Sequence, residues 1–260
     1  MNTFRFLNSS VNILLPNPTS DAFLECLSLY SNPFKLISIS DNSELPENHL
    51  WKGALGVSLP VQDGIVPIFV DMSKLQEEGF PDECWEVIAG HELLHKWLGV
   101  NGYPVVVPGK HFTSEPKVQE IADRLVSLSQ HPLIKQKLSN TKLQTYATYK
   151  IIGTLHIEHV SKLLTDNKIT NLRKGTPVYT LVILECLELY LIHPDYEEEC
   201  DSLLSALDTQ HLQTIKACLK DQEKLYGNPR DILDTLRHWK LLLNIEDKVS
   251  IFDTVKKQWH

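Results

Sequence analysis

The sequence predicts an α+β fold, with a small antiparallel sheet and two helices followed by an all-helical C-terminal part. Two observations indicate this class. Before about residue 80 the apolar residues occur in short β-branched runs bounded by turn-forming residues, which is typical of strands. From Pro81 onward they recur with helical spacing. We expect two domains, residues 1–139 and 140–260, with the boundary near Ser139 to Lys142.

The N-terminal part contains one short helix and several strand-like runs. Ser20 and Asp21 are suited to begin the helix, because their side chains can accept hydrogen bonds from its first N–H groups. The runs that predict strands are Phe34–Ile39, Leu55–Leu59 and Ile65–Val70. Asp63-Gly64 is a turn signal, so the last two runs should form a hairpin. Pro67 lacks an N–H and favours an edge position for the last run.

Two helices should follow this hairpin. The first runs from Pro81 to about Leu98, and Gly99 can close it. The second runs from Ser114 to roughly Ser129, because Pro132 marks a helix boundary. The remaining residues, 133–260, have a helical pattern almost throughout.

Composition and charge narrow the class of partner. The chain is 42% hydrophobic and 22% charged, with a formal net charge of -8. Such a chain has no general attraction for phosphate backbones or anionic lipid, so we expect neither a nucleic-acid partner nor a membrane partner. The apolar stretch from Val178 to Ile192 contains Glu185 and Glu188, and it should form a buried helix rather than a membrane span.

The cysteines and the N-terminus favour a cytoplasmic protein. The five cysteines are scattered and form no CxxC pair, which is not the pattern of a disulfide framework or a cysteine zinc site. Residues Met1 to Asn17 lack a basic segment followed by a long apolar one, so we expect no secretory signal.

The residues that carry chemistry are His91-Glu92-Leu93-Leu94-His95, an HExxH motif. On a helix the i, i+4 spacing places both imidazoles on one face, where they can bind the same metal ion. Zn²⁺ accepts nitrogen ligands in a tetrahedral site and lowers the pKa of bound water to about 7. Glu92 lies beside the first ligand, where it can take a proton from such a water. The alternative is that His91 and His95 are core histidines bonded to backbone, with Glu92 exposed.

With this motif, the order hairpin, HExxH helix, loop and second helix resembles the zincin metallopeptidases over roughly residues 50–132. The short chain looks most like small gluzincins and the ImmA/IrrE-like peptidases. The residues after His95 do not match the metzincin pattern. The resemblance implies an edge strand that lines the substrate cleft, matched here by Ile65–Val70.

A catalytic zinc needs a third protein ligand. The gluzincin resemblance implies a glutamate on the following helix, and we expect Glu120, which lies 25 residues after His95. Glu115, His111 and His131 remain alternatives. Glu115 also suits the first turn of a helix without any metal, and His131 is equally suited to end one.

Another group of candidates lies further along the chain. His156 and His159 have i, i+3 spacing on a predicted helix, and Tyr146 and Tyr149 precede them. Each could bind a second metal or stabilise an oxyanion, or could be a polar residue of an amphipathic helix.

From the sequence we therefore expect a zinc metallopeptidase with His91, His95 and Glu120 as ligands and Glu92 as the general base, acting on a peptide or protein substrate. The alternative is a zincin-shaped regulatory protein with an inactive or structural metal site. In either case the C-terminal helices could contact a protein partner.

Overall fold

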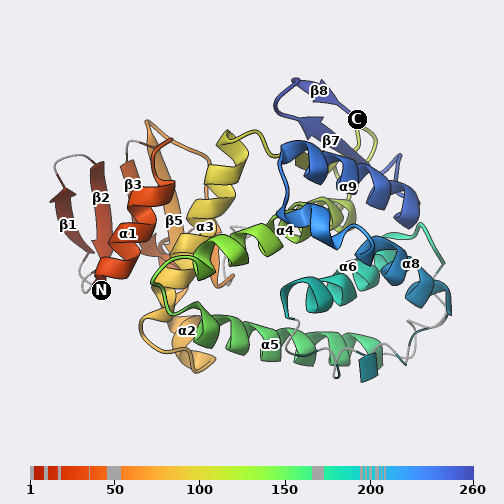
Figure 1. The fold of residues 1–260 in the computed structure, drawn as a ribbon, viewed down its shortest axis with the longest axis horizontal. Helices are drawn as coiled ribbons and strands as arrows, with labels where there is room; N and C mark the ends of the chain where they lie inside the picture. The colour runs from red at the N-terminus through yellow and green to blue at the C-terminus, as the bar shows by residue number, and fades with distance from the viewer. Residues whose placement is uncertain are drawn as a thin grey trace. The chain divides into compact units, whose positions relative to one another are not determined.

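Helices α4 (Pro116–Ser139) and α5 (Thr145–Thr165) are each shared between two compact units of the chain (Figure 1). The first unit comprises residues 1–100 and 134–149, and the second comprises 101–133 and 150–260. The computed structural model describes residues 3–8, 11–16, 19–34, 36–45, 54–165, 173–193, 196, 198, 201, 202, 205, 207 and 209–260. The two units interleave along the chain.

A mixed five-stranded sheet forms one layer of the first unit. In spatial order its strands are β1 (Thr3–Asn8), β2 (Val11–Pro16), β3 (Leu36–Asp41), β5 (Ile65–Val70) and β4 (Gly56–Ser58). The outer pairs β1–β2 and β4–β5 are antiparallel, whereas β2–β3 and β3–β5 are parallel. The prediction of a small antiparallel sheet was therefore wrong. A helix connects β2 to β3, and such a crossover makes the two strands parallel.

The β4–β5 hairpin confirms the turn predicted at Asp63-Gly64. Both residues have positive φ, 51° and 82°, and Gln62 and Ile65 exchange backbone hydrogen bonds of 2.9 and 2.8 Å around them. Positive φ at both central residues of a two-residue turn is the reason that Asp-Gly is favoured there.

The prediction that Ile65–Val70 is an edge strand was wrong, because β5 lies between β3 and β4. The backbone carbonyl of Pro67 accepts a hydrogen bond of 2.9 Å from the N–H of Leu59. In an antiparallel pair the N and C=O of one residue face the same neighbouring strand. The side of Pro67 that lacks an N–H therefore faces the chain just after Ser58, the last residue of β4. Proline is tolerated there because its carbonyl still pairs with Leu59 and only the one hydrogen bond that its N–H would donate is lost.

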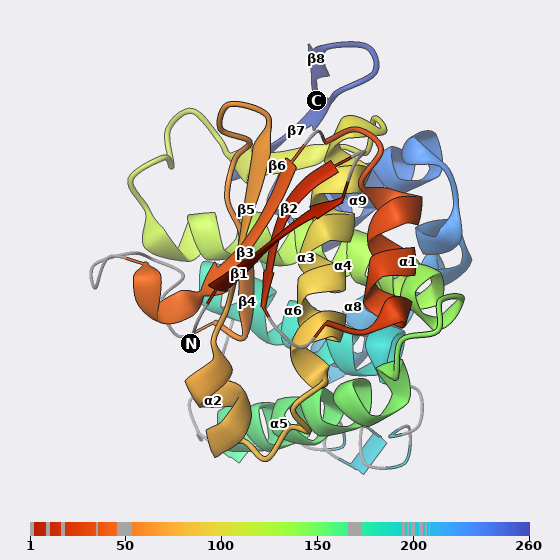
Figure 2. The same cartoon turned by 90° about the vertical axis from the view of Figure 1, so that its left-hand side faces the viewer.

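Two helices lie side by side on one face of this sheet, α1 (Asp21–Tyr30) and α3 (Cys84–Val100) (Figure 2). Ser20 caps α1 as predicted, its Oγ accepting from the N–H of Phe23 at 3.1 Å. The N–H and Oγ of Ser20 donate to the buried carboxylate of Glu86, at 2.6 and 2.5 Å. This contact and the edge-to-face pair Phe23–Trp85 fix α1 against the first turn of α3. A short helix, α2 (Met72–Glu77), leads from β5 toward α3.

The second unit contains a sheet that the sequence analysis missed. Its strands are β6 (Val105–Pro108), β7 (Val249–Asp253) and β8 (Gln258–Trp259), all antiparallel to their neighbours. The prediction of an all-helical C-terminal part was therefore wrong for the last residues of the chain. Val105 pairs with Phe252, and a partner so distant in sequence leaves no local signal beyond one short alternating run.

Helices form the rest of the second unit in the described residues. They are α6 (Pro177–Ile192), α8 (Thr209–Leu219) and α9 (Pro229–Leu243), together with most of α4 and α5. None of the helices in the described part of the chain has both the length and the apolar character needed to cross a bilayer.

The prediction that the helix beginning near Ser114 ends before Pro132 was also wrong. α4 continues through Pro132 to Ser139. A proline inside a helix costs about 3 kcal/mol, but burial of one large aliphatic side chain contributes about 1.5–3 kcal/mol. Ile134 and Leu138, which follow Pro132, are both fully buried, so their burial offsets the cost of the lost backbone hydrogen bond.

Candidate metal centre

Helix α3 presents His91 and His95 on one face, as the i, i+4 spacing predicted. Their Nε2 atoms lie 3.1 Å apart, and both side chains are half-buried. Nitrogen ligands about 2.0–2.1 Å from a tetrahedral zinc ion lie roughly 3.3 Å from one another. The separation of the two nitrogens therefore fits a shared metal ion.

Tyr149 fixes the other side of the His91 ring. Its hydroxyl lies 3.2 Å from Nδ1 of His91, and the tyrosine is buried at the start of α5, within the first unit. Burial, and then the charge of Glu92, raises the pKa of Tyr149, so the phenol stays protonated. When Nε2 of His91 binds a metal, Nδ1 carries the proton and donates to the tyrosine oxygen.

Glu92 lies against strand β4. Its Oε2 accepts a hydrogen bond of 3.0 Å from Oγ of Ser58. A Cβ at Gly56 would lie only 3.1 Å from Cγ of Glu92 and 2.5 Å from Cγ2 of Ile88, so only glycine lets the strand approach this closely. The hydrogen bond from Ser58 and the close approach of β4 thus help to hold the carboxylate that would act as the base.

The C-terminal turns of α4 are anchored to α3 within the first unit. Leu138 lies 3.1 Å from the position that a Cβ on Gly90 would take, and Nζ of Lys137 lies 4.6 Å from the centroid of the Trp97 ring. His131 belongs to the same uninterrupted helix, less than one turn before Ile134, where the first unit resumes.

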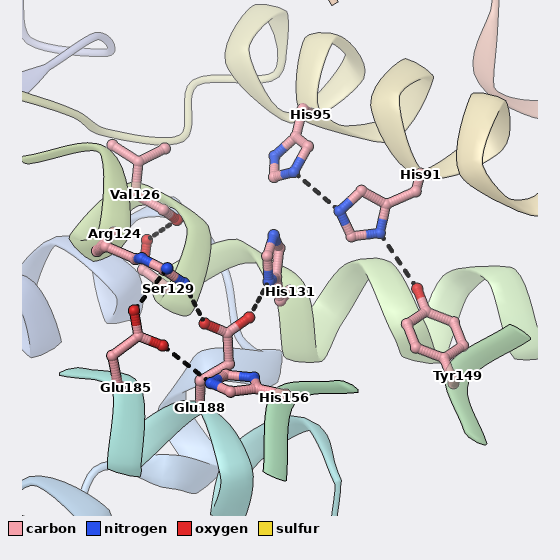
Figure 3. Close-up of polar contacts among 10 residues, drawn as sticks. All are labelled: His91, His95, Arg124, Val126, Ser129, His131, Tyr149, His156, Glu185 and Glu188. Carbon is pink, nitrogen blue, oxygen red and sulfur yellow. Dashed lines mark hydrogen bonds and ion pairs between the residues drawn. The ribbon is translucent and has the colours of Figure 1, made fainter. Parts of the chain in front are cut away.

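Two groups of side chains in the described residues have the composition of a metal site. In the first, ring nitrogens of His91, His95 and His131 all lie within 4.8 Å of one another (Figure 3). The second comprises His156, Glu185 and Glu188. The first group supplies three neutral nitrogen donors, the kind of set that catalytic zinc accepts.

The second unit holds a network of charges around His131. Nδ1 of His131 lies 3.3 Å from Oε1 of Glu188, whose Oε2 accepts from Arg124 at 3.0 Å. Arg124 also contacts Glu185 at 2.5 Å, and the second oxygen of Glu185 lies 2.9 Å from Nε2 of His156. Burial alone would raise the pKa of Glu188, but the hydrogen bond from His131 and the charges of His131, His156 and Arg124 hold it well below its usual value.

The other candidates from the sequence lie elsewhere. Glu120, Glu115 and His111 are exposed and belong to neither group. Glu120 precedes His131 by 11 residues, or about 16 Å along the helix axis, so the two cannot serve the same metal ion from one straight helix. His131, by contrast, belongs to the first group. His159 is 57% exposed at its side chain, 3.7 Å from Glu185.

Sequence reasoning missed Glu188 and Arg124 as parts of this arrangement. A signal was present, because Glu185 and Glu188 interrupt an otherwise apolar helix at i, i+3 spacing. Buried carboxylates require cationic partners, and Arg124 and His131 lie seven residues apart, on one face of their helix.

Comparison with protein-family models, with curated proteins and with solved structures found no match to this chain. The function is therefore argued from the geometry of the metal centre alone.

Proposed function

We propose that this protein is a zinc-dependent peptide hydrolase of the zincin type, with His91, His95 and His131 as metal ligands and Glu92 as general base. The observation that carries the proposal is the convergence of three ligand nitrogens within 4.8 Å, beside a carboxylate held on the same helix. Three histidines in place of two histidines and a glutamate leave both positive charges of the ion uncompensated, which favours ionisation of bound water.

The chain's own groups suit the roles of base and orienting residue. When bound, zinc would polarise a carbonyl group and acidify water. Glu92 takes the proton of the attacking water on its carboxylate and returns it to the leaving amine. The hydroxyl of Ser58 donates to one oxygen of the Glu92 carboxylate and so helps to orient the group that would transfer the proton. The hydroxyl of Tyr149 can accept from Nδ1 of His91 in the tautomer that binds a metal through Nε2.

β4 is the last strand of the sheet in the described residues, and it lies directly against Glu92. An extended peptide could add to this strand through backbone hydrogen bonds, which would bring its backbone near the base. We therefore assign the substrate-binding role to β4, because β5, to which the sequence assigned it, is an interior strand.

Metal analysis and hydrolysis assays test the proposal. The purified protein should contain about one zinc ion per chain, and His91→Ala or His95→Ala should lose it, because two ligands hold zinc weakly. His111→Ala is the matched control, since this exposed histidine should be replaceable without loss of zinc. Full zinc occupancy in either ligand variant would refute the metal site.

Glu92→Gln separates catalysis from metal binding. The variant should keep its zinc and lose at least about a hundredfold in hydrolysis rate on a peptide library, because glutamine cannot act as a base. A zinc-loaded parent protein with no turnover would instead indicate a structural metal site, and equal turnover in parent and variant would show that Glu92 is not the base.

A further inference from the structure

Glu188 and Arg124 lie behind His131, on the side of its ring that faces away from Nε2. Both carboxylates of the network, Glu185 and Glu188, are buried on α6, and Arg124 contacts each of them with a separate nitrogen. A buried carboxylate that lacks a partner costs several kcal/mol, so these contacts are required for the fold itself.

The guanidinium of Arg124 already bridges the two carboxylates that a second metal ion would need. Its Nη2 lies 2.5 Å from Glu185 and its Nη1 lies 3.0 Å from Glu188, so it takes one oxygen of each carboxylate. The group His156, Glu185 and Glu188 therefore has the composition of a metal site but already contains a cation.

The charges of this network are not balanced by Arg124 alone. Arg124 carries one positive charge and contacts two carboxylates, and one of these, Glu188, lies 3.3 Å from Nδ1 of His131. A negative group at that nitrogen favours the tautomer with a proton on Nδ1 and a lone pair on Nε2, and it raises the basicity of Nε2 toward a metal.

We propose that Glu188 is the positioning residue of the third metal ligand, and that Arg124 holds Glu188 in place by bridging it to Glu185. The inference rests on the proposed zinc site, and it adds a carboxylate–histidine pair that orients His131. It also predicts one metal ion per chain, since the second group is closed by Arg124.

The elements that carry these residues explain how the arrangement arises. Arg124 and His131 are two turns apart on α4, and Glu185 and Glu188 are one turn apart on α6, so each pair shares a face of its helix. One helix supplies the two basic groups and the other the two carboxylates (Figure 3).

The test measures the zinc affinity of the full chain by chelator competition. Glu188→Gln should bind zinc about 10–100-fold more weakly, the usual cost of removing a carboxylate behind a ligand histidine. The absorption spectrum of the Co²⁺-substituted protein should change as well, because the His131 ring loses its fixed orientation.

Asp221 provides a matched control elsewhere in the second unit. It is a buried carboxylate that lies 2.5 Å from Nδ1 of His238 and 2.6 Å from Nζ of Lys224. Asp221→Asn therefore removes the same kind of contact away from the metal centre. It should lower stability without changing zinc affinity or the Co²⁺ spectrum.

A double-mutant cycle with His131→Ala excludes a merely structural role for Glu188. If Glu188 acts through His131, Glu188→Gln should cause no further loss of zinc affinity in the His131→Ala protein. A loss that persists in that background, an equal loss in Asp221→Asn, or parental affinity in Glu188→Gln would each overturn the inference.

Two further outcomes are distinguishable. If the parent protein binds no zinc through His91 and His95, the proposed function and this inference fail together. If the parent binds zinc and Glu188→Gln binds it equally well, only the inference fails.

Should Glu188→Gln not fold, Arg124→Lys is the second variant, because it keeps the positive charge but cannot bridge both carboxylates. Parental zinc affinity and an unchanged Co²⁺ spectrum in that variant would overturn the inference.

Discussion

Tyr149→Phe removes one hydroxyl group from behind the first metal ligand and changes nothing else in shape. The hydroxyl lies 3.2 Å from Nδ1 of His91, at the long end of a neutral hydrogen bond. Such a bond contributes about 0.5–1.5 kcal/mol net. If it is formed only when His91 has the metal-binding tautomer, the zinc affinity should fall by about two- to twelvefold, since 1.4 kcal/mol corresponds to tenfold.

The same helix offers a matched control for this change. Tyr146 is one turn before Tyr149 and 71% exposed, so Tyr146→Phe should leave the zinc affinity at the parental value. Both variants and the parent would be compared by chelator competition, with the free energy of unfolding of the metal-free proteins measured by urea titration.

The reasoning also predicts an order of effects. The tyrosine is a neutral partner and Glu188 is a charged one, and hydrogen bonds to charged groups are about twice as strong. Tyr149→Phe should therefore weaken zinc binding less than Glu188→Gln does. Equal affinities in Tyr149→Phe and Tyr146→Phe would refute the role assigned to this hydroxyl.

Three further changes test other parts of the structure. Glu120→Gln should leave the zinc content unchanged, because this exposed glutamate belongs to neither ligand group, and zinc loss would restore it as the third ligand. Gly56→Ala should lower the free energy of unfolding by about 1–3 kcal/mol and reduce hydrolysis with zinc retained, because the new Cβ would push on Ile88 and Glu92. Burial alone would raise the pKa of Asp221, but hydrogen bonds from its lysine and histidine partners hold this pKa below its usual value. The stabilisation by the ionised carboxylate is therefore fully present above about pH 4, and it is lost as the pH falls through the lowered pKa. Urea titration should accordingly show that Asp221→Asn costs about 1–3 kcal/mol at pH 7 and less at low pH; an equal cost at both would contradict this sign.

Part of the metal centre could be predicted from the sequence because it depends on one helix. The i, i+4 spacing alone predicts that His91 and His95 lie on the same face of their helix, and the structure confirms this. The β4–β5 hairpin was predictable for a similar reason, since Asp63-Gly64 determines the turn locally. Each of these features needs no knowledge of which elements pack together.

The features that were missed depend on pairing between distant segments. β6 and β7 are separated by about 140 residues, and neither strand has a strong pattern without the other. The interior position of β5 was misjudged because Pro67 was treated as a property of the whole strand. In the structure Pro67 lacks only the hydrogen bond that its N–H would donate, while its carbonyl accepts from the N–H of Leu59.

The helix boundary at Pro132 also affected how His131 was weighed as a third ligand. The gluzincin resemblance favoured Glu120, and taking Pro132 as a boundary made His131 equally suited to end the helix. In the structure the burial of Ile134 and Leu138 extends α4 past the proline, and His131 lies inside the helix, with its Nδ1 3.3 Å from Glu188. A proline removes one backbone hydrogen bond from a helix but need not end the helix. A proline flanked on both sides by residues of one apolar stripe is therefore better treated as lying inside the helix. Applied to this chain, that rule would have placed His131 and Arg124 on one face of a single helix, and the two glutamates in the apolar segment 178–192 would then have been their expected partners.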